Sequence, residues 1–156
     1  MNGDNAKLRG WARRRVLQAS AAALCMPLLP SSARAELADT ERAIGALFGG
    51  RAIREGRVVV TLPPISENGY SVPLVVLVDS PMSEQDHVLR IAVFTEKNPL
   101  PDVARFELGP RAGIARVETR IRLGASQRIR AVAEMNDGSL WTGYAFTVVT
   151  LAACLL

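Results

Sequence analysis

Residues 114–123 have the sequence Ile-Ala-Arg-Val-Glu-Thr-Arg-Ile-Arg-Leu, in which uncharged side chains alternate with charged ones. This two-residue period is typical of a β-strand that buries one face and exposes the other. The side chains expected on the buried face are Ala115, Val117, Thr119, Ile121 and Leu123. Those expected on the exposed face are Arg116, Glu118, Arg120 and Arg122. The pattern predicts a half-buried antiparallel strand with a charged outer face.

Six other stretches predict strands at intervals of roughly ten residues. They are residues 58–62, 71–78, 88–95, 103–108, 128–135 and 140–151. Turn-forming sequences separate them, among them Glu67-Asn68-Gly69-Tyr70 and Asn136-Asp137-Gly138-Ser139. Seven short strands with this spacing predict an all-β fold, an immunoglobulin-like antiparallel β-sandwich, with an open barrel as the alternative.

A short amphipathic helix is predicted ahead of the first strand, over residues 39–48. Asp39 or Thr40 can cap its start, and Gly49-Gly50 can end it. Its apolar face consists of Ile44, Leu47 and Phe48. The alternative is that this segment is a frayed N-terminal extension.

The first 35 residues have the organisation of an export signal. Arg13-Arg14-Arg15-Val16-Leu17-Gln18 precedes an apolar run over residues 19–29, and Ala33-Arg34-Ala35 follows it. The paired arginines are typical of the twin-arginine export route, so we expect cleavage after Ala35 and a periplasmic protein. An uncut membrane anchor is the alternative, but the run is shorter than the ~20 apolar residues that a span needs.

Removal of this signal changes the charge and the thiol content of the chain. The signal contains six of the 19 basic residues and one of the 15 acidic residues, which leaves 13 basic and 14 acidic residues and a net charge of −1. That balance argues against a nucleic-acid-binding protein. Cys25 leaves with the signal, and Leu24 before it does not suit a lipoprotein signal. The remaining 121 residues fit one domain, over residues 36–150, followed by a C-terminal arm.

That arm, residues 151–156, contains Cys154 as the only thiol of the mature chain. The thiolate is the reactive form of cysteine, yet no lysine, arginine or histidine lies between Met135 and Leu156. Activation would have to come from a partner protein, which favours a covalent carrier over a self-contained enzyme. Extended, the residues from Thr150 to Cys154 reach at most ~13–14 Å. The alternative is that the leucines of the tail dock on the fold and Cys154 is an ordinary small buried residue.

Other candidate sites are weaker. His87 is the only histidine, and Asp79, Glu84 and Asp86 fit a solvated turn better than a pair of catalytic carboxylates. Trp141 and Tyr144 fit either the core or a partner contact. We therefore expect no catalytic residue, no metal site and no cofactor in this chain.

Short motifs along the mature chain resemble the SoxY family of bacterial sulfur oxidation. They are Pro64-Ile65-Ser66-Glu67-Asn68-Gly69 with Val72-Pro73, Asp79-Ser80-Pro81-Met82, Asn98-Pro99-Leu100-Pro101-Asp102-Val103-Ala104, Thr119-Arg120-Ile121-Arg122-Leu123, Gln127 and Asp137-Gly138-Ser139. Their order and spacing carry the resemblance, which runs from the signal to the C-terminal tail.

The resemblance implies a carrier of sulfur intermediates in thiosulfate oxidation. SoxY proteins have an immunoglobulin-like fold and pair with a SoxZ subunit. A cysteine near the C-terminus, Cys154 by position, carries the substrate covalently. A haem-containing SoxAX enzyme loads thiosulfate on the thiol, SoxB hydrolyses the terminal sulfonate, and a sulfane dehydrogenase acts on the remaining sulfur in some bacteria. The implied partners are therefore proteins, and neither nucleic acid nor, after signal removal, a membrane is expected.

The tail departs from the family's pattern, which is Gly-Gly-Cys-Gly-Gly or nearly so. Here Ala152 and Ala153 precede Cys154, and Leu155 and Leu156 follow it. Glycines give the arm conformational freedom and keep it thin. A diverged SoxY-like subunit that pairs with a SoxZ-like partner without carrying substrate is therefore the alternative.

Overall fold

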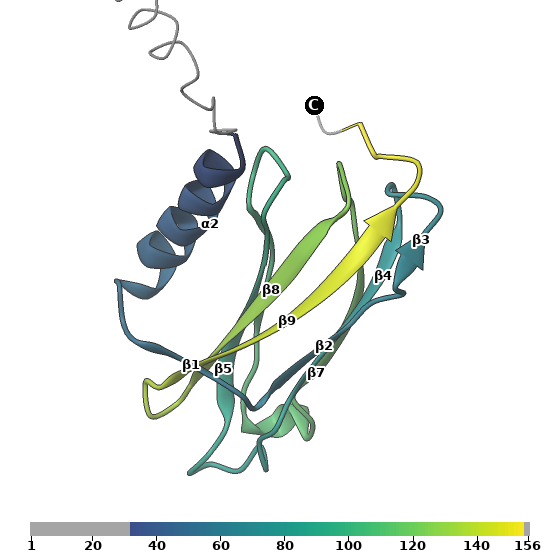
Figure 1. The fold of residues 1–156 in the computed structure, drawn as a ribbon. Coiled ribbons are helices and arrows are strands. Elements are labelled where there is room, and N and C mark those ends of the chain that lie inside the picture. The colour runs from purple at the N-terminus through teal and green to yellow at the C-terminus, as the bar shows by residue number, and fades with distance from the viewer. Residues whose placement is uncertain (1–31, 155–156) are drawn as a thin grey trace, which may run out of the picture. The chain divides into compact units, whose positions relative to one another are not determined.

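The structure is a computed structural model that describes residues 32–154, with side chains from residue 37 onward (Figure 1). The predicted signal therefore lies almost wholly outside the described residues. Two β-sheets form the fold. The first contains, in spatial order, β1 (Ile53–Glu55), β9 (Leu140–Val149), β8 (Gln127–Met135), β5 (Val88–Thr95) and β6 (Asp102–Glu107), and the short β3 (Ile65–Ser66) also pairs with β9. The second contains β2 (Val58–Thr61), β4 (Val72–Val78) and β7 (Arg116–Ile121).

All seven predicted strands are present, and the two-sheet sandwich is confirmed. The sequence missed β1 and β3, which have only three and two residues. Both pair in parallel with β9, so that Ile53 lies opposite Leu140 and Ile65 opposite Val148. Hydrophobic periodicity could not reveal them, because such short strands depend on their partner for stability.

Strand β7 behaves as its alternation predicts. Ala115, Ile121 and Leu123 are buried, whereas the four charged side chains between them are exposed. Within residues 32–154, only one edge of β7 is paired, to β4, with Val76 opposite Val117. This strand therefore forms one side of the sandwich and leaves its other edge open.

The main core lies between the two sheets. Its fully buried side chains come from alternate positions of strands in both layers. The largest of them are Leu74, Ile91, Leu123, Ile129 and Met135. The same alternation sends other apolar side chains outward, so Leu77 on β4 is 40% exposed while Leu74 is 1% exposed.

Helix α2 (Ser32–Phe48) covers the outer face of the first sheet (Figure 1). Ile44 and Phe48 are buried there against Phe94, Val132 and Leu140, as the predicted apolar face requires. Leu47 is partly buried beside them. Because these contacts fix the helix to the sheet, the segment is a packed element and not a frayed extension.

The predicted start of this helix is wrong. Asp39 and Thr40 lie inside α2, which begins at Ser32. The residues before Asp39 include several alanines, which favour continuation of a helix. Asp39 pairs with Arg42 at 2.8 Å, and the buried Thr40 hydroxyl donates to the Thr95 carbonyl at 3.1 Å. The C-terminal end is as predicted: Gly49 and Gly50 have φ of 67° and 70°, which favours glycine.

Two leucines on β4 allow a matched test of this packing. We expect Leu74→Ala to lower the free energy of unfolding by about 2–5 kcal/mol, since it leaves a cavity between the sheets. Leu77→Ala removes the same atoms from the exposed face and should cost less than about 1 kcal/mol. Urea unfolding of the mature chain measures both. Equal losses would contradict the assignment of the two faces.

Candidate functional site

Cys154 lies just beyond the last anchored residue of the tail. Cys154 is a free cysteine, and its side chain is exposed. The preceding Ala153 is buried, with 6% of its surface accessible. The buried position that the alternative assigned to Cys154 is therefore occupied by Ala153, and the thiol is accessible to a reagent or a partner protein.

Backbone hydrogen bonds hold the chain from the end of β9 to Ala153. The Thr150 N–H donates to the Ser66 carbonyl at 3.1 Å. The Leu151 carbonyl accepts from the Gly69 N–H at 2.8 Å, and the Ala153 N–H donates to the Leu123 carbonyl at 3.0 Å. In this conformation the thiol therefore stays at the surface of the fold and does not extend from it by the length of residues 151–154.

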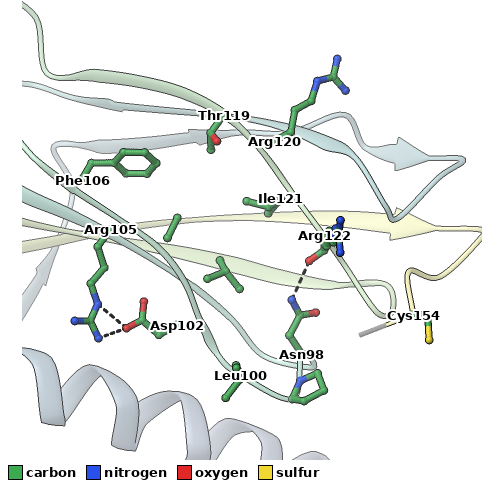
Figure 2. A pocket seen from close by; sticks show the side chains of 13 residues that line it. Asn98, Leu100, Asp102, Arg105, Phe106, Thr119, Arg120, Ile121, Arg122 and Cys154 are labelled. Atoms are coloured by element: carbon green, nitrogen blue, oxygen red, sulfur yellow. Dashed lines mark hydrogen bonds and ion pairs between the residues drawn. The ribbon is translucent and has the colours of Figure 1, made fainter. Parts of the chain in front are cut away.

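Cys154 is one of the residues that line a groove of about 680 Å³ (Figure 2). The groove lies between β6 and β7, the open edge strands of the two sheets, and the loop at residues 98–100 closes one side. Its apolar lining includes Leu100, Phe106 and Ile121. Figure 2 shows Cys154 at one end of the groove and the Asp102–Arg105 ion pair farther along it.

Asn98 fixes the end of the groove near Cys154. Its Nδ2 donates to the Arg122 carbonyl at 2.9 Å, and its Oδ1 accepts from the Gly124 N–H at 3.2 Å. The Gln127 Nε2 also donates to this Oδ1, at 2.9 Å. Gln127 is buried. One side chain thus ties the 98–100 loop to the segment that follows β7, which gives a physical reason for two of the motifs found in the sequence.

Three of the residues around the groove are arginines. A hydrogen bond to Asp102, together with that carboxylate's charge, raises the pKa of Arg105 above its ordinary value. Arg120 donates to the Ser71 carbonyl and hydroxyl, at 3.3 and 3.2 Å. Within residues 37–154, no carboxylate forms an ion pair with Arg120 or Arg122. Figure 2 shows the Arg120 side chain pointing away from the groove, toward the outer face of β7.

The fold brings the backbone of Arg122 close to that of Cys154, although the two residues are far apart in the sequence. Arg122 precedes Leu123, and Cys154 follows Ala153, so each is one residue from the hydrogen-bonded pair Leu123–Ala153. In the sequence, no lysine, arginine or histidine lies between Met135 and Leu156. The charged face of residues 114–123 is visible in the sequence. Its closeness to the tail depends on the tertiary contact between Leu123 and Ala153.

The histidine and the acidic residues that the sequence offered as weaker candidates lie in one loop and make ordinary loop contacts. The His87 Nδ1 lies 2.9 Å from the Ser83 carbonyl oxygen, and Asp86 pairs with Arg57 at 3.1 Å. Both lie in the connection between β4 and β5, which also contains Asp79 and Glu84. Among the described residues, no group of three histidine, cysteine or acidic side chains could hold a metal ion.

The two aromatic residues of β9 differ in role. Trp141 packs against the main core, and its indole N–H donates to the Ser139 hydroxyl at 3.1 Å. The guanidinium groups of Arg54 and Arg57 each lie 5.7 Å from its ring centre. Tyr144 is exposed, with two arginines over its ring. Trp141 is thus a core residue, and Tyr144 is a surface residue.

Comparison with known proteins identifies the family. Residues 44–154 match the model of the sulfur oxidation protein SoxY, and the matched segment ends on Cys154. The chain belongs to the SoxY family. The solved structure of the sulfur carrier protein SoxY from Chlorobium limicola f thiosulfatophilum is similar, with 29% identity and a TM-score of 0.62 over 74% of this chain and 99% of that one. Both findings support a sulfur-carrier role in sulfur oxidation.

More distant structures share only the fold. The superoxide reductase (neelaredoxin) from Ignicoccus hospitalis is 17% identical, with a TM-score of 0.53 over 60% of this chain and 80% of that one. A search of curated proteins found no match. In the described part of the chain, no helix has both the length and the apolar character that crossing a membrane requires.

The charge near the thiol can be tested with two disulfide reagents. We expect Arg122→Gln to slow the reaction of Cys154 with anionic 5,5′-dithiobis(2-nitrobenzoate) about twofold more than its reaction with neutral 2,2′-dithiodipyridine. A charge ~8 Å away in water contributes ~0.5 kcal/mol. Second-order rates at ~0.1 M salt, where the Debye length is ~10 Å, measure the ratio, and ~1 M salt should abolish the difference.

Arg116→Gln is the matched control for this experiment. Arg116 lies on the same face of β7, six residues from Arg122, which corresponds to ~20 Å along a strand. Its substitution should leave the ratio of the two rates unchanged. An unchanged ratio in Arg122→Gln would show that this charge does not act on the thiol.

Proposed function

We propose that this chain is a covalent carrier of sulfur intermediates in thiosulfate oxidation and that Cys154 is the attachment site. The observation that carries the proposal is that the SoxY match ends on Cys154, which is an exposed free thiol at the end of a groove.

Loading is an oxidation. The Cys154 thiol loses its proton, its sulfur forms a bond to the outer sulfur of thiosulfate, and two electrons pass to the SoxAX-type enzyme. The product is a cysteine S-thiosulfonate. A SoxB-type enzyme then hydrolyses the terminal sulfonate with water and releases sulfate, which leaves a persulfide on Cys154. A sulfane dehydrogenase would accept six electrons from the outer persulfide sulfur, which takes up three oxygens from water and becomes a cysteine S-sulfonate. Hydrolysis of that S–S bond would release a second sulfate and regenerate the thiol.

The proposal also covers the cellular location of the protein and its partner subunit. Residues 13–18 and Ala33-Arg34-Ala35 support export by the twin-arginine route, cleavage after Ala35 and a periplasmic location. Since α2 begins at Ser32, that cleavage would shorten the helix at its start and leave its packed end, Ile44 and Phe48, in place. A SoxZ-like subunit would pair with the chain. Strands β2, β6 and β7 each have an open edge in this chain, and open edges need cover.

A second candidate function rests on the tail. Ala153 is buried and hydrogen-bonded, and alanines stand where the family has glycines. A subunit whose tail stays docked would still form the heterodimer but would not carry substrate. The next two experiments separate the two functions.

The first measures loading directly. The mature protein and its SoxZ-like partner are incubated with thiosulfate and a SoxAX-type enzyme, and the intact mass of the chain is then determined. We expect a thiosulfate-sized mass increase in the wild type and none in Cys154→Ser. Absence of the adduct, or its persistence in Cys154→Ser, would rule out Cys154 as the carrier.

The second changes the arm. Replacing Ala152, Ala153, Leu155 and Leu156 together by glycine restores the family's pattern. We expect thiosulfate-dependent turnover with the partner enzymes to rise several-fold, because glycine gives the arm access to more backbone conformations. The adduct yield with SoxAX alone serves as a control for loading. Lack of activity both before and after the change would favour the non-carrying subunit.

A further inference from the structure

Three segments that are far apart in the sequence meet at Gly69. The Gly69 N–H donates to the Leu151 carbonyl at 2.8 Å, and the Gly69 carbonyl accepts from the Leu123 N–H at 2.8 Å. The Leu123 carbonyl in turn accepts from the Ala153 N–H at 3.0 Å. We call these three hydrogen bonds the Gly69 clasp. They join the 67–70 turn, the chain after β7 and the tail immediately before Cys154.

Only glycine fits at the centre of the clasp. A Cβ atom on residue 69 would lie 2.4 Å from the Leu123 carbonyl oxygen and 2.8 Å from the Ala153 nitrogen. It would also lie 3.0 Å from the Leu151 carbonyl oxygen. All three atoms belong to the backbone, so no side-chain rotation relieves the contacts. Gly69 does not have a positive φ, so the requirement is for space and not for an unusual conformation.

The turn that carries Gly69 is itself held firmly. The Asn68 Oδ1 accepts from the Tyr70 N–H at 2.8 Å, and the Ser66 hydroxyl donates to the Asn68 carbonyl at 3.1 Å. The Thr150 hydroxyl donates to the Glu67 carbonyl at 3.1 Å, which ties the end of β9 to the same turn. The clasp is therefore a preformed feature of the sandwich and not a chance contact of a loose tail.

Resting on the carrier role of Cys154, we propose that Gly69 is a positioning residue that parks the carrier thiol at the mouth of the groove. In the parked state backbone hydrogen bonds hold the tail at Thr150, Leu151 and Ala153, and the Cys154 side chain is exposed. Breaking the bonds of Leu151 and Ala153 releases residues 151–154, which extend to at most ~13–14 Å. Delivery of cargo into a partner enzyme thus requires release from the clasp, and Gly69 sets how often release occurs.

The test compares a bulky and a small thiol reagent on the full mature chain. We expect Gly69→Ala to raise the rate of Cys154 labelling by a polyethylene glycol maleimide about tenfold relative to labelling by N-ethylmaleimide. The bulky reagent needs an extended arm more than the small one does. Hydrogen exchange of the tail peptide that contains Ala153 should accelerate by a similar factor, with exchange in β5 and β8 unchanged.

Two other glycines provide matched controls. Gly109→Ala makes the same change where nothing lies within 4 Å of the new Cβ, and it should leave both readouts unchanged. Gly143→Ala places its Cβ 2.1 Å from the Val58 carbonyl oxygen, a clash away from the tail. It should lower stability without raising the ratio of bulky to small labelling. An equal rise in Gly143→Ala would overturn the proposal, since the effect would then be general loosening.

A second variant covers the case in which Gly69→Ala does not fold. Ala153→Pro removes the N–H that donates to Leu123 and adds nothing at Gly69. It should raise the labelling ratio in the same direction. If neither the ratio nor the tail exchange changes in the folded variants, the clasp does not park the thiol.

These measurements need neither thiosulfate nor a Sox enzyme. A wild-type chain that fails to load thiosulfate while Gly69→Ala raises the labelling ratio would refute the carrier function and leave the clasp in place. Normal loading with an unchanged ratio would refute the clasp alone.

Discussion

The constraint on which the structure depends is the burial of alternate side chains between two sheets of unequal size. The second sheet has only three strands, so it must bury one face almost completely to remain attached. Val72, Leu74, Val76 and Val78 do this along β4, at 0–2% exposure. Because β4 is central in that sheet, its neighbours β2 and β7 inherit their register from it. A one-residue slip would expose the whole set.

That register has a consequence for the tail. With β7 fixed on β4, the chain after β7 emerges where Leu123 is buried and both its backbone groups are directed to other segments. One group pairs with Gly69 and the other with Ala153. The carrier cysteine is thus positioned by the same packing that holds the sandwich together. The open edges of β6 and β7 leave the groove beside it, because the two sheets do not close into a barrel.

Residues 114–123 and the other alternating stretches predict most of the strands, but they do not predict the short strands or the contacts around the site. Alternation and turn signals predicted seven strands, since both are local properties. The short strands β1 and β3 and the first residues of α2 were missed, because they depend on a partner strand or on the composition of the preceding segment. At the site, Cys154 was evident as a lone thiol. The closeness of the backbone at Arg122 to the tail, the groove between β6 and β7 and the clasp at Gly69 depend on long-range contacts that no local pattern contains.

The alanines of the tail acquire a physical meaning from this geometry. The methyl group of Ala153 is buried, and its N–H makes a hydrogen bond to the Leu123 carbonyl. A glycine at 153 would keep the N–H but lose the buried methyl, and it would gain conformational freedom in the released state. Where the backbone conformation suits both residues, such a change from glycine to alanine stabilises the ordered state by about 0.4–1 kcal/mol. The loss of the family's glycine therefore favours the docked tail, and it does so without hiding the sulfur, which is carried by the next residue and remains exposed.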